Sequence, residues 1–352
     1  NSEVVTPQLL ADELVNLLPP EATQHDDTIL DISTVEGEIA CAIQRKFGST
    51  FNQRLYSIPS SPLAYELTRK IYSILNMPIE HIMDFFSYDL IGDNTDELVQ
   101  RLVSIDPDVV IGVPPFSEKA GGGRGDGGSA IYHKFFNFVK DNLSSRYIDM
   151  MMQSTWYTGG RGDGLDDFRD YMLDDSEGSK HVREFHDYPN VETYVKGVTT
   201  LRGGICLFLW DREYDGDCLL INRINHQDYP MIRPLRYTYG DFRADFLIRW
   251  NEGLSILDKV LSRETSFIYE KESPQMRSRN PFRFPNTADN FSQRQTRVCN
   301  TKVYLAKGKV GYAKDSQYSH TAELDALKNS WKVLIAKSSS GTDSLPHLVI
   351  SN

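Results

Sequence analysis

The sequence IGVPPF, residues 111–116, joins a short apolar run to two prolines and an aromatic ring. Proline fixes the backbone torsion φ, so Pro114 and Pro115 predict a rigid loop. Phe116 follows directly, and such a loop can present its ring as a flat platform. A platform of this kind suits stacking on a purine that has been turned out of a duplex. These residues therefore predict a site for chemistry on a base, and the alternative is a rigid surface turn.

Methyl transfer to the exocyclic amine of a purine requires two acceptors that hold the NH₂ group. The usual pair is the side-chain carbonyl of Asn or Asp and the backbone carbonyl of the next proline. Here Val113 precedes Pro114, and a valine side chain accepts no hydrogen bond. Losing one positioned contact in a transition state commonly lowers a rate by about 10²–10³. We expect the catalytic segment Val113, Pro114, Pro115 and Phe116 to bind a base but to work slowly.

The elements that must position this loop alternate between short apolar strands and amphipathic helices. Strands are predicted at 28–32, 54–58, 82–90, 108–113, 146–153 and 180–188, and helices at 7–19, 37–47, 62–75, 95–105, 130–143 and 165–175. This alternation predicts an α/β fold, with a mostly parallel sheet and helices on both faces. Two further strands, 203–213 and 217–224, are joined by the turn signal YDGD, which predicts an antiparallel pair at one sheet edge.

Ligands of open α/β sheets bind outside the carboxyl ends of the strands. The loops after the first four predicted strands should therefore meet around a ligand. In the first loop, Asp31 supplies a carboxylate. Gly37 stands where a helix begins, and it could bring backbone amides close to a ligand. The alternative for Gly37 is an ordinary loop glycine.

Charge is distributed unevenly along the 352 residues. The chain has 38 Lys+Arg and 49 Asp+Glu, a net charge of −11. Residues 231–352 hold 19 basic and 12 acidic side chains (+7), so residues 1–230 hold 19 and 37 (−18). This predicts an acidic α/β domain, 1–230, and a smaller mixed α+β domain with a basic surface, 231–352. The strand-like ending SLPHLVISN suggests that the second domain is partial.

The basic excess is densest in residues 273–314, which contain nine Lys or Arg and one acidic residue, Asp289. Arginines and aromatic rings alternate there. Arginine suits phosphates and guanine edges, and aromatic rings stack on bases, so the segment predicts contact with nucleic acid. The alternative is a solvated surface. The predicted DNA-binding residues are Arg277, Arg279, Arg283, Arg294, Arg297 and Lys302.

Several compartments and site classes are disfavoured. The cysteines are Cys41, Cys206, Cys218 and Cys299. They form no CxxC pair, which favours buried thiols in a reducing compartment. The histidines show no metal-ligand spacing, so no metal site is expected. No apolar run is long enough to span a membrane, and the start NSEVVTPQLL does not resemble a signal peptide. A cytoplasmic protein is expected.

Segments along nearly the whole chain share one resemblance. They are VVTPQLLADELVNLLP, TILDISTVEGE, RLYSIPSSPLAYELTRKIYSILNMP, FFSYDL, DVVIGVPPF, MMMQSTWYTGGRGDGLDDFRDYML, VKGVTTLRGGICLFLWDREYDGDC and KVYLAKGKVGYAKD. In this order they resemble the adenine-specific DNA N6-methyltransferases of the S-adenosylmethionine-dependent, Rossmann-like class, in the Eco57I-type restriction–modification group. The resemblance implies a Rossmann-like first domain and a target-recognition domain after it.

The resemblance also implies a cofactor and the residues that hold it. The cofactor is S-adenosylmethionine, and the matching positions are Thr6, Pro7, Asp31, Gly37 and Asp89. Thr6 and Pro7 match residues at the methionine part of the cofactor, and Asp89 matches the acidic residue at its adenine. The chain departs from the family pattern at Ile32, Val35, Pro59 and Val113. These departures weaken the expected cofactor contacts and the expected amine contact.

The implied function is transfer of a methyl group to adenine N6 in double-stranded DNA, with a restriction–modification subunit as a possible partner. Val113 leaves a second hypothesis open, in which the chain is a catalytically silent methyltransferase fold that binds DNA or a partner subunit. A third hypothesis is methylation of RNA or of a protein glutamine. The arginine-rich second domain disfavours it.

Overall fold

The computed structural model describes residues 6–23, 27–117, 129–158, 164–194, 203–262, 291–304, 310–314, 332–335 and 348–351. Contacts between residues divide the chain into two units, Asn1–Ser255 and Ile256–Asn352. The proposed boundary between residues 230 and 231 falls inside a strand, Gln227–Arg233, of the first unit's sheet. The first unit holds every residue predicted for the cofactor and the base.

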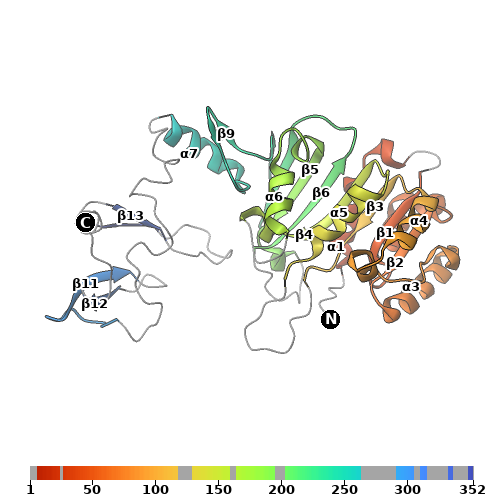
Figure 1. Cartoon of the computed structure of the whole chain (residues 1–352), viewed down its shortest axis with the longest axis horizontal. Helices are drawn as coiled ribbons and strands as arrows, with labels where there is room; N and C mark the ends of the chain where they lie inside the picture. The colour runs from red at the N-terminus through yellow and green to blue at the C-terminus, as the bar shows by residue number, and fades with distance from the viewer. Residues whose placement is uncertain are drawn as a thin grey trace. The chain divides into compact units, whose positions relative to one another are not determined.

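The first unit is built on an eight-stranded sheet with the order β2-β1-β3-β4-β6-β5-β7-β8 (Figure 1). The strands are β1 (Ile29–Thr34), β2 (Leu55–Pro59), β3 (Val109–Gly112), β4 (Tyr147–Gln153), β5 (Val182–Tyr188), β6 (Ile205–Asp211), β7 (Cys218–Ile224) and β8 (Gln227–Arg233). Strands β6 and β8 run opposite to the other six. The predicted α/β fold with a mostly parallel sheet is confirmed.

The α-helices of the described residues are α1 (Gln8–Leu17), α2 (Glu38–Phe47), α3 (Pro62–Leu75), α4 (Asp96–Ile105), α5 (Tyr132–Asn142), α6 (Leu165–Leu173) and α7 (Asn251–Leu261). The sequence sets their ends locally. In α3, for example, the Ser61 side chain accepts a hydrogen bond from the Ala64 amide, and Pro62 occupies the first turn.

Helices cover both faces of the sheet. On β6, the alternate residues Phe208 and Trp210 face α5, where their rings lie 5.9 and 6.0 Å from the ring of Phe136. On β5, His186 faces the other way and lies 3.6 Å from the carboxylate of Glu13 on α1. Since neighbouring strand residues point to opposite faces, α5 and α1 lie on opposite sides of the sheet.

The predicted antiparallel pair formed by the last two strands is wrong. Strands β6 and β7 are joined by the short YDGD turn, but β5 lies between them and pairs with both. All seven residues of β6 are buried. A strand buried along its whole length is best placed with a neighbour on each side, and β6 gains these from β4 and β5.

The predicted strand at 82–90 is also largely wrong. Ile82 forms a single parallel bridge with Ser57 of β2. Residues 83–86 form neither strand nor helix, and a 3₁₀-helix, η4 (Ser87–Ile91), follows them. Its first turn is closed by Asp89, whose carboxylate accepts a hydrogen bond 2.8 Å long from the Phe86 amide. This local bond favours the turn over an extended chain.

The described residues of the second unit form two small antiparallel pairs. Strand β11 (Cys299–Tyr304) pairs with β12 (Val310–Lys314), and β13 (Lys332–Ile335) pairs with β14 (Leu348–Ser351). In the first unit, β9 (Thr238–Tyr239) and β10 (Phe242–Arg243) form one more short hairpin. The division between the units falls within α7.

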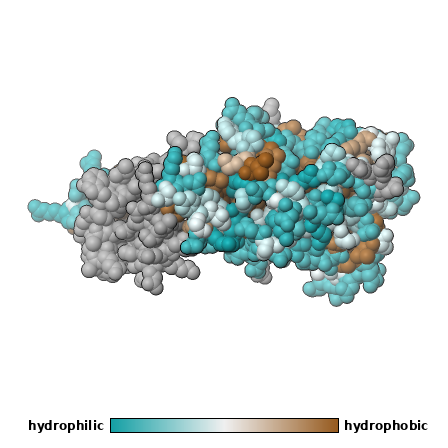
Figure 2. All heavy atoms as spheres, turned by 90° about the horizontal axis from the view of Figure 1, so that it is seen from above, coloured by the Kyte–Doolittle hydropathy of each residue, from teal (hydrophilic) through white to brown (hydrophobic). Residues whose placement is uncertain are grey.

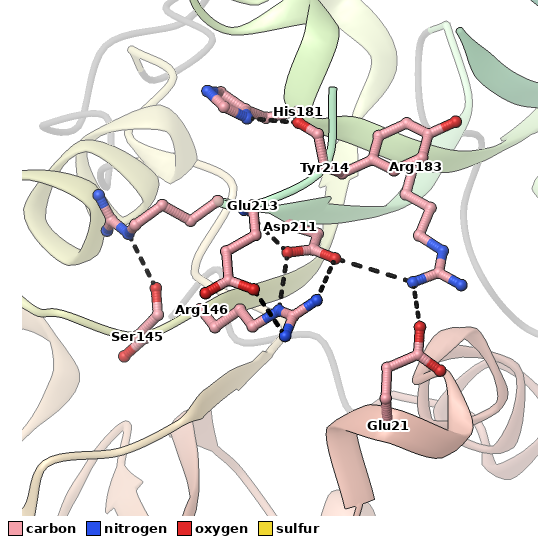
Figure 3. A network of polar contacts seen from close by, with 9 residues as sticks. Glu21, Ser145, Arg146, His181, Arg183, Asp211, Glu213 and Tyr214 are labelled. Carbon is pink, nitrogen blue, oxygen red and sulfur yellow. Dashed lines mark hydrogen bonds and ion pairs between the residues drawn. The ribbon is translucent and has the colours of Figure 1, made fainter. Parts of the chain in front are cut away.

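An ion-pair network closes the sheet edge opposite the carboxyl ends of its parallel strands (Figure 3). The buried carboxylate of Asp211, at the end of β6, accepts hydrogen bonds from Arg146, at 3.1 and 3.4 Å. It also lies 3.7 Å from Arg183 of β5. Arg146 reaches Glu213, and Arg183 reaches Glu21 of the 3₁₀-helix η1 (Pro20–Thr23). The network therefore connects η1 and the start of β4 to the strands β5 and β6.

Figure 2 shows one face, on which hydrophilic side chains predominate and hydrophobic ones form separate areas. On α3, Leu63 and Ile74 are exposed. Exposed apolar side chains of this scattered kind are normal. Within the described ranges, none of the helices has the length and apolar character needed to cross a membrane.

Candidate cofactor and base site

The order of the strands defines one point where a ligand site is expected. Strand β1 has β2 on one side and β3 on the other. The chain leaves β1 toward β2 and later returns to β3, so the strand order reverses between β1 and β3. The crevice outside the carboxyl ends at such a reversal is the usual ligand site of open α/β sheets. The loop 113–116 begins there, directly after β3.

Asp31 lies in β1 near this point and is fully buried. Its Oδ1 atom accepts a hydrogen bond 3.2 Å long from the Ser33 amide, and its Oδ2 atom has no hydrogen-bond partner among the described residues. Burial raises the pKa of Asp31 well above its usual value, and the charge of Glu38 adds to this effect. A buried carboxyl oxygen without a partner is costly, so it marks a place that a proton or a ligand can satisfy.

Gly112 ends β3 beside Asp31. Its φ is +151°, and a Cβ atom at this position would lie 3.1 Å from Asp31 Oδ1 and 3.2 Å from the side chain of Ile32. Side chains rarely adopt this torsion, and a Cβ atom here would require Asp31 or Ile32 to shift by a few tenths of an ångström. The contact holds the start of the 113–116 loop against the predicted cofactor carboxylate.

The loop after β1 satisfies its own amides. Gly37, with φ of +74°, precedes α2, and its amide donates to Thr34 Oγ1 at 3.1 Å. The Glu38 carboxylate accepts hydrogen bonds from the amides of Val35 and Glu36, at 3.2 and 2.7 Å. The sequence predicted that amides at this helix N-terminus would approach a ligand. In the structure, the two amides before Gly37 bond to Glu38 instead.

The loop 113–116 is buried rather than presented to solvent. Val113 is 9% exposed and Phe116 is 6% exposed, and both prolines between them are buried. The Phe116 ring meets the ring of Tyr132 edge-on, at 6.4 Å and 89°. The Phe116 carbonyl accepts a hydrogen bond from Ile131, at 3.2 Å. The structure therefore brings Val113, the prolines and Phe116 together, but it covers the aromatic ring that was expected to form an open platform.

The remaining predicted cofactor residues have different environments. Thr6 is buried, and its hydroxyl has no hydrogen-bond partner among the described residues. Pro7 precedes α1, and its carbonyl accepts from the amides of residues 10 and 11. Asp89 is exposed in η4. The hydroxyl of the neighbouring Ser87 lies 3.2 Å from that of Ser33, so η4 is tied to the end of β1.

Sequence reasoning missed Ser60 as a candidate. Its amide donates to the Thr34 carbonyl at 2.9 Å, which places it beside the end of β1. Its buried hydroxyl has no partner in the described part of the chain. The family pattern has an acidic residue at the position of Pro59. The only signal for Ser60 in the sequence was the pair of serines that follows this proline.

The predicted DNA-binding residues divide into two groups. Arg277, Arg279 and Arg283 lie outside the described residues. Arg294, Arg297 and Lys302 are described, and all three are exposed. Lys302 lies on β11, and the two arginines lie in the segment that leads into it. The structure thus leaves three of the six basic side chains accessible on the second unit.

Comparisons with known proteins give one curated relative and several similar structures. No family model matches. Over 140 residues the chain is 29% identical to an uncharacterized adenine-specific methylase of Mycoplasma pneumoniae, and the match covers 38% of this chain and 32% of the relative. The chain therefore spans about a third of that relative's length.

Solved structures with a similar fold include two restriction–modification proteins. The type I restriction–modification methyltransferase subunit from Streptococcus thermophilus matches with a TM-score of 0.45 and 16% identity, over 75% of this chain and 55% of that chain. The M protein of the type I restriction enzyme EcoKI matches with a TM-score of 0.45 and 14% identity, over 63% and 48%. This chain spans about half of each.

Proposed function

We propose that the chain is an S-adenosylmethionine-dependent methyltransferase that acts on adenine N6 in double-stranded DNA, with a rate limited by Val113. The observation that carries the proposal is the position of the VPPF loop. It begins at the carboxyl end of β3, in contact with the buried Asp31 of β1 through Gly112. The partial similarity to a protein described as an adenine-specific methylase supports the choice of chemistry.

The residues at the sheet edge fit this cofactor. Asp31 Oδ2, Ser60 Oγ and Thr6 Oγ1 are among the buried side-chain atoms that have no hydrogen-bond partner within the described residues. A carboxylate suits the cofactor's positive charges, and serine and threonine hydroxyls suit its ribose and carboxylate oxygens. When bound, S-adenosylmethionine supplies an activated methyl group. The amides of Val35 and Glu36 already donate to the Glu38 carboxylate. In our proposal the ligand is therefore held mainly by side chains rather than by these amides.

The loop after β3 performs the second task, which is to hold the base. The Pro114 carbonyl accepts one hydrogen bond from the amine, and the Phe116 ring stacks on the purine. Val113 offers no second acceptor, so the amine is held on one side only. This loss predicts slow transfer rather than loss of the site.

The basic side chains of the second unit serve the DNA backbone in this proposal. Replacing Arg294, Arg297 and Lys302 with Ala should weaken duplex binding and lower its salt dependence by about one unit of slope per lost phosphate contact. The same number of exposed basic residues on the first unit, Arg45, Arg69 and Lys70, provides a matched control. Equal losses in both triple variants would contradict a local DNA surface. A restriction–modification subunit remains a proposed partner.

A catalytically silent fold is the second candidate, and two observations favour it. The first-loop amides are already bonded to Glu38, and Phe116 is buried. Calorimetric titration with S-adenosylmethionine separates the candidates. The enzyme predicts saturable binding that Asp31→Asn weakens, whereas the silent fold predicts none. Absence of binding to the wild-type chain would remove the main proposal.

A further inference from the structure

Tyr132 connects the loop after β3 with the segment after β4. It is the first residue of α5 and is fully buried. Its ring packs edge-on against Phe116, and its hydroxyl lies 2.9 Å from Thr155 Oγ1. Thr155 belongs to the 3₁₀-helix η5 (Ser154–Thr158), which follows β4 directly. One side chain therefore touches both the candidate base-stacking ring and the neighbouring strand end.

The segment that holds Thr155 is itself anchored. The Ser154 amide donates to the Gly204 carbonyl, at 3.0 Å, just before β6. Gly203 and Gly204 both have positive φ, and a Cβ atom on Gly204 would lie 2.0 Å from the Tyr188 carbonyl. The backbone here is closely packed against the end of β5. The Thr155 hydroxyl is consequently a fixed point to which Tyr132 can bond.

The backbone just before Tyr132 holds the loop 113–116. Ile131, the preceding residue, donates its amide to the Phe116 carbonyl at 3.2 Å. Ser117 and Ala130 form an antiparallel bridge one residue further out. These backbone bonds form a clamp on Phe116, and the Tyr132 ring contacts the Phe116 ring, so a shift of α5's first turn would move Phe116.

We propose that Tyr132 is a positioning residue, which fixes the orientation of the Phe116 ring through the hydrogen bond of its hydroxyl to Thr155. The consequence for catalysis rests on the proposed methyl transfer. In this role Tyr132 does not touch the base; it sets the position of the Phe116 ring on which the purine is proposed to stack. A misplacement of about 1 Å at a reacting centre can lower a rate by about 10².

Four single variants separate this role from simple stabilisation. Tyr132→Phe keeps the ring and removes the hydroxyl, and Thr155→Val removes its partner at nearly constant volume. Thr155→Ser retains a hydroxyl and should rescue. Tyr188→Phe is the control, because Tyr188 is a buried tyrosine whose hydroxyl bonds to Glu13 on α1.

The first readout does not require that the protein transfers a methyl group. It is hydrogen exchange of the Ile131 amide, which reports directly on the Phe116 clamp. Tyr132→Phe and Thr155→Val should speed this exchange about tenfold, the double variant should be no faster than either, and Thr155→Ser and Tyr188→Phe should match the wild type. An unchanged Ile131 rate in Tyr132→Phe would overturn the proposal, as would equal effects in Tyr188→Phe.

The second readout is methyl transfer to a mixture of genomic duplex DNA, measured in the wild type and in a Val113→Asn background. We expect Tyr132→Phe and Thr155→Val to lower kcat about tenfold with little change in KM for DNA. If the Ile131 exchange responds as expected while no background methylates DNA, the positioning of Phe116 stands and the proposed function fails. If transfer occurs and kcat does not respond, the role of Tyr132 in the reaction is contradicted.

Discussion

Gly112, at the carboxyl end of β3, lies beside Asp31 of β1, and a Cβ atom on residue 112 would come within 3.1 Å of Asp31 Oδ1. The contact joins the candidate base loop to the candidate cofactor carboxylate without an intervening side chain. The proposed site depends on this close approach.

Gly112→Ala should therefore damage both fold and ligand binding. The unfavourable torsion alone costs about 1–3 kcal/mol, and the new methyl group must displace Asp31 or Ile32. Thermal unfolding and cofactor titration measure the two effects. Gly240→Ala is the control, because Gly240 also has positive φ but has open space around its Cβ position. Loss of cofactor binding in both variants would argue against a specific role for the Gly112 contact.

Binding of S-adenosylmethionine should release a proton from Asp31. Burial raises the pKa of this carboxyl well above its usual value, which favours its protonated form when no cation lies beside it. A nearby positive charge favours the carboxylate and lowers that pKa. Calorimetry in two buffers of different ionisation enthalpy measures the release. Asp31→Asn should bind more weakly and release no proton, and a buffer-independent heat in the wild type would contradict the prediction.

Stability should depend on pH through His186. Burial lowers the pKa of this imidazole, but hydrogen bonds to Glu13 and Glu184 raise it more, and the net pKa lies above the usual value. Arg223 and Tyr188 also border this cluster. A raised folded-state pKa stabilises the fold fully below the unfolded-state value of about 6.5, and this contribution is lost as pH rises through the folded value.

The measurement is urea unfolding at several pH values from about 6 to 9. The wild type should lose more stability over this range than His186→Gln, which removes the titrating group. His181→Gln leaves the cluster intact and should retain the wild-type slope. Parallel curves for the wild type and His186→Gln would show that the cluster does not couple protonation to folding.

The Asp211 network should support the fold and leave the ligand site untouched. Asp211→Asn removes a buried charge that faces Arg146 and Arg183, and it should destabilise the chain by about 1–3 kcal/mol. Glu213→Gln is matched in chemistry but affects an exposed carboxylate, so less than about 1 kcal/mol is expected. Chemical unfolding gives both values. A larger effect for Glu213→Gln, or loss of cofactor affinity in Asp211→Asn, would contradict this assignment.

The local part of the fold could be predicted from the sequence. The apolar run around Asp31 predicts β1, and Pro62 predicts the start of α3. Both predictions succeed because strand burial and helix capping depend on neighbouring residues. The place of the VPPF loop at a strand end follows from the same reasoning. These features need no knowledge of distant contacts.

Most of the features that could not be predicted from the sequence depend on contacts between distant segments. The insertion of β5 between β6 and β7 depends on pairing that no turn sequence specifies. The burial of Phe116 depends on Tyr132, sixteen residues further along the chain, and the unpaired hydroxyl of Ser60 becomes visible only once neighbours are placed. The bond from Glu38 to the first-loop amides is local, but acceptors of this kind compete with ligands in ways that spacing does not reveal.

The central claim is that this chain transfers a methyl group to adenine N6, and product analysis tests it most directly. The wild type and Val113→Asn are each incubated with isotope-labelled S-adenosylmethionine and a genomic mixture of duplex DNA, and the digested nucleosides are separated by mass. The account predicts labelled N6-methyladenine from both, with about 10²–10³ more from Val113→Asn, because asparagine supplies the missing acceptor. Label on another base, or no label in DNA with either protein, would contradict it.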